Sequence, residues 1–302
     1  MKIGILSFRP LGLKASVEEI EIKKAAQRRG HTSRIFRSKR FQMIYDQESP
    51  WLLYNGKTFP KYDVMITRPS VLQNASLEIS LIEQMELMGT LLFNRYDSIL
   101  KTKNKVKTMQ ILDHHGIPIP KTVVVRRIDD LEQAVKLVGG FPLILKEPYG
   151  SFGKGVTIAE SMRALKSILF WNKPMYLLQE FVKFSRGKDT RVFVIDGKVV
   201  GAMERSARKG EFRSNIELGG IGKAAETTEE EDRIAIRAVD VLELNYGGVD
   251  IVKSKNGPLV LEVNSNPGFK ALEEAIGISV AGELVDYAID LAERHKLKTT
   301  SI

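Results

Sequence analysis

The chain of 302 residues is long enough to bury a sizeable core, and its 43% hydrophobic and 27% charged residues are ordinary for a soluble globular protein. It has no cysteine, which excludes disulfides, a thiolate nucleophile and a cysteine-based zinc site and favours a reducing cytoplasm; no apolar run reaches the roughly 18–20 residues that cross a bilayer. The formal net charge is +9, and residues 1–45 hold 11 lysines and arginines against three acids.

Residues 1–95 alternate between strand-like and helix-like patterns. The predicted strands and helices follow one another at 2–7, 17–29, 62–67 and 75–88. Gly30 and Gly89 follow the two helices, and glycine commonly ends a helix because it adopts the left-handed conformation without strain. Because strand–helix alternation is typical of a parallel sheet, we expect residues 1–95 to form an N-terminal α/β domain.

The basic stretch at residues 1–45 has three interpretations. It is either a solvated helix face with an adjoining loop, or a docking surface for an acidic partner or substrate. Binding of nucleic acid is the weakest of the three, because aromatic and basic residues do not interleave here as they do in RNA-binding proteins.

The central part of the chain, residues 96–175, begins with a basic amphipathic helix predicted at 98–115. This helix is expected to end before Gly116, because two prolines follow that glycine closely. Short strands and helices then alternate at 121–127, 129–138, 142–147, 155–160 and 161–171.

The C-terminal part, residues 176–302, has longer extended runs, which are typical of antiparallel hairpins. They are predicted at 175–182, 190–196, 198–205, 248–253 and 258–264. A helix at 228–243 begins with Thr228-Glu-Glu-Glu231, the pattern of a capping box. The fold class is therefore α/β in the first part of the chain and α+β in the last.

The last two extended runs flank Lys255-Asn256-Gly257, a hairpin turn signal. If the turn centres on Asn256, Asp250 lies opposite Glu262, and Asn264 points to the same face as Glu262 because strand side chains alternate. Opposed carboxylates repel without a counter-charge, and oxygen ligands from Asp, Glu and Asn suit Mg²⁺ or Mn²⁺. The alternative is a register shifted by one, with one acid in solvent, but apolar residues on both faces disfavour it.

A glycine-rich stretch follows the apolar strand that ends at Lys146. Its small residues are Gly150, Ser151, Gly153 and Gly155. Glycines let a loop fold over phosphates, and a lysine adds a point charge, but alone this pattern is equally consistent with a plain turn. The spacing is neither that of a P-loop nor that of a dinucleotide-binding fingerprint, so both classes are disfavoured.

Two further segments carry charge at strand ends. Glu180 follows a buried strand, and the junction there has the groups to bind adenine and ribose, although a solvated acid is an equal alternative. Cationic and amide residues then gather in or beside a glycine-bearing loop: Arg205, Arg208, Lys209, Arg213 and Asn215. Loop charges are usually solvated, but these suit a triphosphate and an acidic substrate.

The order of these motifs resembles that of the ATP-grasp superfamily and, within it, the RimK branch of α-L-glutamate ligases. The motifs that carry the resemblance are Lys146 before the glycine loop, Gln179-Glu180, Asp189-x-Arg191, Phe212-Arg213-Ser-Asn215, Asp250 and Glu262-Val-Asn264-x-Asn266-Pro-Gly268. The resemblance implies an N-terminal, a central and a C-terminal unit, at 1–95, 96–175 and 176–302, with ATP held between the last two. It also implies amide formation through an acyl phosphate.

The resemblance assigns roles to individual residues. ATP would be bound by Lys105, Lys146, Gly150, Ser151, Gly153, Gly155, Glu180, Phe181, Asp189, Arg213, Ser214 and Asn215. Arg205 and Arg213 are the candidate catalytic residues, and two Mg²⁺ or Mn²⁺ ions would be bound by Asp250, Glu262 and Asn264. The last three are the residues that the hairpin pattern indicates on its own.

Three functions are compatible with the sequence. The favoured one is a ligase that adds glutamate to a protein or peptide acceptor, for example the C-terminus of a small-subunit ribosomal protein. The second is the same chemistry on a small-molecule or carrier-protein acceptor, as in lysine-pathway or cofactor-glutamylating ligases. The third is a nucleotide-gated binding protein without turnover. We expect a homo-oligomer, no membrane partner, and no nucleic-acid partner except through a ribosome.

Overall fold

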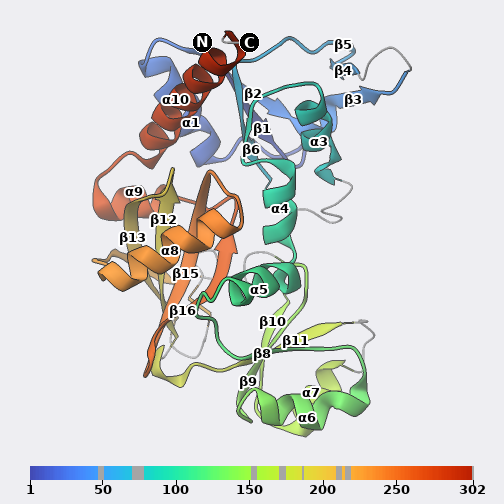
Figure 1. Cartoon of the computed structure of the whole chain (residues 1–302), viewed down its shortest axis with the longest axis vertical. Helices are drawn as coiled ribbons and strands as arrows, with labels where there is room; N and C mark the ends of the chain where they lie inside the picture. The colour runs from blue at the N-terminus through green and yellow to red at the C-terminus, as the bar shows by residue number, and fades with distance from the viewer. Residues whose placement is uncertain are drawn as a thin grey trace.

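The computed structural model describes residues 1–46, 51–69, 78–150, 155–169, 175–185, 187–208, 213–214 and 219–300. Within these residues the chain forms sheets of four, four, five and three strands. Figure 1 shows the N-terminal parallel sheet at the top, the five-stranded sheet in the middle and the second four-stranded sheet at the bottom. In the same described ranges no helix combines the length and the apolarity that a membrane span needs.

The N-terminal sheet has the strand order β2-β1-β6-β7, and every neighbouring pair is parallel. Its strands are β1 (Lys2–Ser7), β2 (Thr32–Arg37), β6 (Val64–Arg68) and β7 (Leu92–Phe93). The helices beside it are α1 (Val17–Arg28) and α3 (Ser80–Leu87). The predicted strands at 2–7 and 62–67 and the helix at 17–29 are confirmed to within two residues. The helix expected at 75–88 is confirmed for Ser80–Leu87, and 75–77 lie outside the described residues.

A small antiparallel sheet was not predicted from the sequence. It has the order β3-β4-β5 and follows the short 3-10 helix η1 (Ser38–Arg40). Its strands are β3 (Phe41–Ile44), β4 (Trp51–Tyr54) and β5 (Lys57–Thr58). The strands are two to four residues long, and such short runs carry too little periodicity to identify.

The single helix predicted at 98–115 is wrong, because two helices occupy this stretch. They are α4 (Tyr96–Lys103) and α5 (Lys105–His114). Asn104 separates them with an extended backbone, φ −107° and ψ 104°, and its side chain accepts hydrogen bonds from the backbone N–H groups of Val106 and Lys107. Asparagine is a strong N-cap, so it begins a second helix where apolar periodicity alone suggests a continuous one.

The central sheet has the order β10-β9-β11-β8, and its neighbouring strands are antiparallel. The strands are β8 (Thr122–Val125), β9 (Leu143–Lys146), β10 (Val156–Ala159) and β11 (Tyr176–Glu180). The helices η2 (Ile128–Asp130), α6 (Leu131–Leu137) and α7 (Met162–Leu169) accompany them. Because β11 pairs with β8 and β9, this sheet continues to Glu180, beyond the boundary expected near residue 175.

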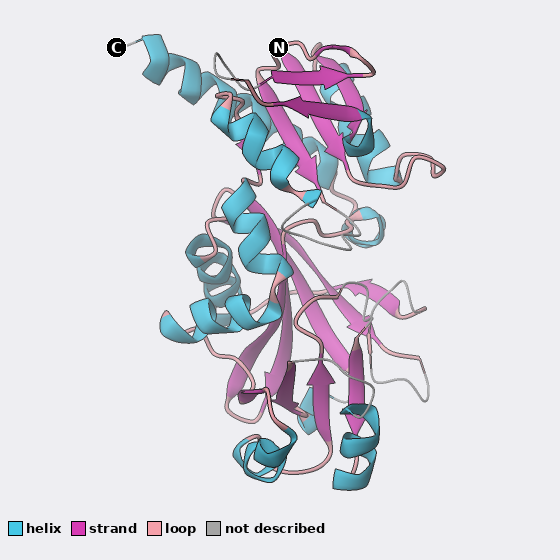
Figure 2. Ribbon diagram, turned by 90° about the vertical axis from the view of Figure 1, so that its right-hand side faces the viewer, coloured by secondary structure: helices cyan, strands magenta, loops and turns pink. Residues whose placement is uncertain are grey.

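The five-stranded sheet has the order β14-β13-β12-β15-β16 and is antiparallel throughout. After the 3-10 helix η3 (Lys183–Ser185), its strands are β12 (Lys188–Ile195), β13 (Lys198–Ser206), β14 (Ile221–Ala224), β15 (Tyr246–Ser254) and β16 (Gly257–Asn264). Figure 2 shows its long strands below the parallel sheet. Helix α8 (Glu229–Val241) packs on it and begins with the predicted capping box of Thr228 and Glu231.

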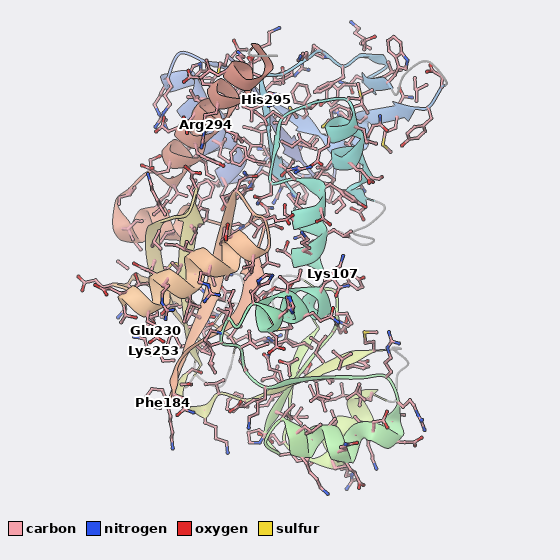
Figure 3. The ribbon with its side chains drawn as sticks, viewed as in Figure 1. Lys107, Phe184, Glu230, Lys253, Arg294 and His295 are labelled. Atoms are coloured by element: carbon pink, nitrogen blue, oxygen red, sulfur yellow. The ribbon has the colours of Figure 1, made fainter. Side chains whose placement is uncertain are left out.

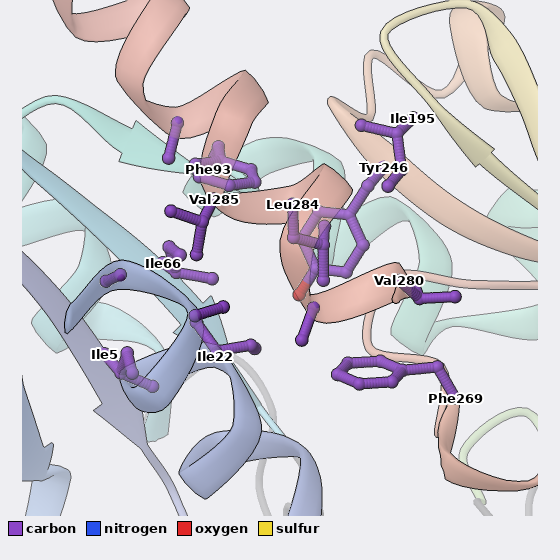
Figure 4. Packing of buried hydrophobic residues seen from close by; sticks show 14 of the residues in the cluster. Ile5, Ile22, Ile66, Phe93, Ile195, Tyr246, Phe269, Val280, Leu284 and Val285 are labelled. Carbon is purple, nitrogen blue, oxygen red and sulfur yellow. The ribbon is translucent and has the colours of Figure 1, made fainter. Parts of the chain in front are cut away.

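The chain ends by returning to the N-terminal sheet. After α9 (Lys270–Ile276), the long helix α10 (Val280–Thr300) packs against α1 and β6. One buried cluster therefore joins Ile5 and Phe93 of the parallel sheet to Tyr246, Phe269 and Leu284 (Figure 4). Burial of this shared apolar surface holds the two sheets together, and it fixes the metal-site hairpin predicted above relative to the N-terminal sheet.

Asn94 lies directly after β7 and links the two sheets by hydrogen bonds. Its side chain is completely buried. Its amide donates to the carbonyls of Tyr246 and Ser265 at 2.8 and 2.9 Å, and its oxygen accepts from the backbone N–H groups of Asn245 and Tyr246 at 2.7 and 3.2 Å. These bonds satisfy backbone groups at the start of β15 and the end of β16, so Asn94 positions the hairpin.

We expect Asn94→Ala to lower the free energy of unfolding by on the order of 3–5 kcal/mol, because it leaves several buried backbone groups without partners. Urea denaturation followed by circular dichroism measures this loss. Asn256→Ala, in the exposed hairpin turn, is the matched control and should change stability by less than about 0.5 kcal/mol. A loss below about 1 kcal/mol for Asn94→Ala would show that the network does not support the fold.

Candidate active site

A cleft lies between the central sheet and the five-stranded sheet. Its empty space, counting the part that is open to solvent, is about 830 Å³. One end is mainly apolar and the other carries the charged side chains that the sequence singled out. Lysines from the central part face acids and arginines from β12, β13, β15 and β16 across this charged end.

The apolar end is built where β11 ends. Ile144, Val156 and Leu261 contribute apolar walls from three different strands, and the chain at Glu180 and Phe181 passes along the rim. The Glu180 carboxylate accepts a long hydrogen bond, 3.4 Å, from the backbone N–H of Lys121. Apolar walls of this kind suit a heterocyclic base, which needs surface to stack against.

Two lysines extend into the charged end. Lys105, the first residue of α5, is 8% exposed. Its Nζ donates to the Gly150 carbonyl at 2.9 Å and lies 3.4 Å from Glu262 Oε1. Lys146 ends β9, and its Nζ donates to the Leu261 carbonyl at 3.5 Å. Burial lowers the pKa of Lys146 to about 8, and the Glu262 carboxylate only partly offsets this effect. Both ammonium groups are suited to bind phosphate.

This lowered pKa of Lys146 predicts that the affinity for a nucleotide falls as the pH rises above about 8. Above about pH 8, Lys146 of the nucleotide-free protein has lost its proton, so nucleotide binding must be accompanied by uptake of a proton from solvent. Calorimetry in buffers of different ionisation enthalpy should show proton uptake above about pH 8. In the unfolded chain the pKa returns to about 10.5, so stability without nucleotide should rise between those pH values.

Lys146→Met should remove most of this proton uptake and weaken nucleotide binding on the order of 10- to 100-fold. Lys107→Met is the control, because Lys107 is exposed on α5 (labelled in Figure 3) and carries the same charge. If the nucleotide affinity of the unaltered protein stays constant from about pH 7 to 9, Lys146 does not bind the phosphates.

A buried ion-pair network lines the charged end of the cleft. Asp189 accepts two hydrogen bonds from Arg205, both 2.7 Å, and a third from the Ser214 hydroxyl. Asp250 accepts two from Arg191, at 2.7 and 2.8 Å, and Arg205 lies 2.9 Å from its second oxygen. Burial raises the pKa of Asp250, but Arg191 and Arg205 outweigh this effect and hold it at about 2. Burial lowers the pKa of Arg205, but Asp250 and Asp189 raise it by more, so the pKa lies above its ordinary value.

The predicted hairpin register is confirmed, since Asp250 pairs with Glu262. The turn does not centre on Asn256, however, because Ser254 pairs with Gly257 across a two-residue turn. A β-bulge that adds Leu261 to β16 shifts the register by one and places the two acids opposite each other. The Asn264 amide donates to Asp250 Oδ2 at 3.5 Å, so the predicted oxygen-bearing side chains converge.

The counter-charge of Asp250 differs from the one we expected. We expected a divalent cation between the opposed acids, whereas Arg191 and Arg205 already bind both Asp250 oxygens. Arg205 lies at the end of the strand predicted at 198–205, as expected, but it is only 1% exposed and is therefore not a solvated charge. Strand periodicity gives no signal for Arg191, which belongs to the neighbouring strand β12.

The donor set nonetheless fits Mg²⁺ or Mn²⁺. The Glu262 side chain is one-third exposed and borders the cleft with Asp250. In the described ranges no three histidine or acidic side chains gather. An ion here would thus have two carboxylates and the Asn264 amide as protein ligands, and phosphate oxygens and water would complete its shell.

The remaining predicted residues fall into three sets. Phe181, Asp189, Arg213 and Ser214 all border the same cleft. Gly155, with φ of +74°, begins the turn into β10, and a Cβ there would meet the Glu147 side chain at 2.9 Å. Three predicted residues, Ser151, Gly153 and Asn215, lie outside the described residues.

Comparison with known proteins gives matches along nearly the whole chain. The RimK-like ATP-grasp domain matches residues 102–288, and the RimK PreATP-grasp domain matches residues 1–99. A probable alpha-L-glutamate ligase of Coxiella burnetii is 39% identical over 293 residues, 95% of each chain. One of Aliivibrio fischeri is 37% identical over 305 aligned residues, 99% of each chain. The solved structure of the ATP-grasp ligase PsnB with minimal precursor, Mg and ADP is similar in fold, with a TM-score of 0.73 at 19% identity over 96% of this chain and 98% of that chain.

Proposed function

Because this chain belongs to the RimK-like ATP-grasp family and is an ATP-dependent ligase that forms carbon–nitrogen bonds, we propose that it adds glutamate to the carboxyl group of a protein or peptide acceptor. The observation that carries the proposal is the cleft with an apolar slot at one end and Lys105, Lys146, Asp250 and Glu262 at the other. The names of the relatives support glutamate as the amino acid. The absence of cysteine and the need for ATP support a cytoplasmic location.

In this proposal the cleft binds ATP along its length. The adenine stacks between the apolar walls beside Glu180 and Phe181, and the phosphates extend toward Lys105 and Lys146. Arg213, partly exposed beside the cleft, contacts the phosphates from the opposite side. Arg205 is buried between two aspartates, so we assign it a positioning role rather than contact with the reacting atoms.

The reaction then has two steps. An oxygen of the acceptor carboxylate attacks the γ-phosphorus of ATP, ADP leaves, and an acyl phosphate forms. The glutamate amine attacks the acyl carbon, loses a proton, and phosphate leaves with the original carboxylate oxygen. Both steps depend on positioning and charge stabilisation, which the lysines and Arg213 supply. A divalent ion held by Glu262, Asn264 and Asp250 would neutralise phosphate charge.

A screen tests the proposal. The protein is incubated with ATP, Mg²⁺, each amino acid and a panel of peptides, and ADP release and product mass are measured. We expect ADP release that needs glutamate and a peptide, with products heavier by whole glutamyl units. ADP release without a peptide acceptor would redirect the proposal to a small-molecule acceptor. No ADP release with any amino acid would contradict it.

A further inference from the structure

Arg68 is a buried cation whose hydrogen-bond and ring partners, among the described residues, are neutral groups. It is the last residue of β6, at the carboxyl end of the parallel sheet, and it is 4% exposed. Its terminal nitrogens donate to the Pro267 carbonyl at 3.2 and 3.3 Å, and its guanidinium lies 5.5 Å from the centre of the Phe269 ring. The Tyr246 hydroxyl is also adjacent, and the Arg68 Nε atom has no hydrogen-bond partner.

This environment differs from that of the other cleft arginines. Arg191 and Arg205 each form two or more short bonds to aspartate. In the part of the chain that the structure describes, no carboxylate forms an ion pair with Arg68. A buried guanidinium without an anion is costly, because desolvation is not offset by Coulomb attraction. Its planar donor fork matches a carboxylate in geometry and charge.

The two residues that precede Pro267 in the sequence each have a buried polar atom without a hydrogen-bond partner. These atoms are Ser265 Oγ and Asn266 Oδ1. Buried polar atoms are almost always satisfied, so unsatisfied atoms in the two residues before Pro267, whose carbonyl binds Arg68, favour a missing ligand at this position. These residues directly follow Asn264, the last residue of β16, so they adjoin the charged end of the cleft.

The electrostatics of this position also favour an anion. Lys103 is the last residue of α4, and it experiences the charges of the Glu262 carboxylate and of the Lys105 and Arg68 cations. Burial and the neighbouring cations lower the pKa of Lys103 to about 8, with Glu262 opposing them. A bound anion would offset this accumulation of positive charge. Ligands of open parallel sheets bind beyond the carboxyl ends of the strands, where Arg68 lies.

We propose that Arg68, supported by Ser265 and Asn266, binds a carboxylate of the amino-acid substrate beyond the phosphate end of the cleft. This inference rests on the proposed ligase function, and it deepens that function by assigning the substrate's position. The amino acid would lie on the N-terminal sheet side of Glu262 and Asn264, with its amine toward the phosphate end. Either its α-carboxylate or its side-chain carboxylate has the chemistry that Arg68 recognises.

Binding calorimetry with the full chain, Mg²⁺ and a non-hydrolysable ATP analogue tests this assignment. The titrants are L-glutamate, L-glutamine, which lacks the side-chain carboxylate, and glutamate α-amide, which lacks the α-carboxylate. Arg68→Met removes the charge while keeping the length. Arg34→Met is the matched control, because Arg34 is exposed on β2 of the same sheet.

We expect Arg68→Met to weaken glutamate binding on the order of 100-fold, because a buried charge pair loses one partner. Arg68→Lys should restore part of the loss, and Arg34→Met should change nothing. If Arg68 binds the side-chain carboxylate, Arg68→Met should bind glutamate and glutamine equally. If Arg68 binds the α-carboxylate, Arg68→Met should bind glutamate and glutamate α-amide equally. Thermal unfolding of Arg68→Met should match or exceed that of the unaltered protein, because the variant removes a buried unpaired charge.

Two results would overturn the assignment: glutamate affinity unchanged in Arg68→Met, or no glutamate binding by the unaltered protein. A lower thermal midpoint with unchanged glutamate affinity would mean that Arg68 only joins the two sheets. Arg68-dependent glutamate binding without any ADP release in the peptide screen would keep the site and reject the proposed reaction. ADP release with a different amino acid, without glutamate binding, would reject the site and keep the ligase chemistry.

Discussion

Glu262→Gln is expected to slow ATP-dependent ligation on the order of 1,000-fold, because it removes the most exposed carboxylate at the phosphate end of the cleft. Loss of several kcal/mol of charge stabilisation corresponds to a change of this size. The Glu262 side chain is one-third exposed and lies 3.4 Å from the Lys105 ammonium, so the substitution should leave folding almost unchanged. ADP release over a range of Mg²⁺ concentrations measures the effect, and the concentration giving half-maximal rate should also rise.

Glu230→Gln is the control for charge. Glu230 lies in the first turn of α8, away from the cleft residues, and is labelled in Figure 3. This variant should keep the rate of the unaltered protein and its dependence on Mg²⁺. A Glu262→Gln rate within about threefold of the unaltered protein would exclude Glu262 as a metal ligand.

Arg205→Met should lower the free energy of unfolding by about 3–5 kcal/mol, because it leaves Asp189 without its guanidinium partner in a buried position. Arg205 is 1% exposed and its two bonds to Asp189 are both 2.7 Å. Asp250 keeps Arg191, so most of the loss should come from Asp189. Urea denaturation measures the free energy, and nucleotide binding should weaken in parallel because both aspartates border the cleft.

The double variant Arg205→Met with Asp189→Asn separates charge from packing. Removing the unpaired carboxylate should recover a large part of the lost stability, since adjacent substitutions in one network do not add. Arg294→Met is the matched control, because Arg294 is half exposed and its ion pair with Asp290 should contribute less than about 1 kcal/mol. No recovery in the double variant would mean that Arg205 acts through packing rather than through its charge.

Local patterns in the sequence were sufficient to predict the strands that line the cleft, although not the separate helix that begins at Lys105. Alternating apolar residues around Lys255-Asn256-Gly257 identified the hairpin, and the pairing of Asp250 with Glu262 is confirmed. The predicted turn centred on Asn256 is not the cause of this pairing, because a two-residue turn and a bulge at Leu261 together produce it. A bulge changes the register by one residue without a clear compositional signal, so periodicity alone does not reveal it.

The partners of the predicted residues were not predictable, because they depend on strand order. β12 lies between β13 and β15, and this places Arg191 and Arg205 against Asp250. The sequence separation of 59 residues between Arg191 and Asp250 carries no periodic signal. Arg68 was overlooked for the same reason, since only the return of the chain to the N-terminal sheet brings Pro267 to the end of β6.

The claim that carboxylate activation passes through an acyl phosphate is tested most directly by following a carboxylate oxygen. An acceptor peptide whose C-terminal carboxylate carries a heavy oxygen isotope is ligated to glutamate with ATP, and the phosphate products are analysed by mass spectrometry. The two-step reaction proposed above transfers one labelled oxygen to inorganic phosphate for each amide formed. Label found in AMP, or inorganic phosphate that carries none while amide accumulates, would contradict the account.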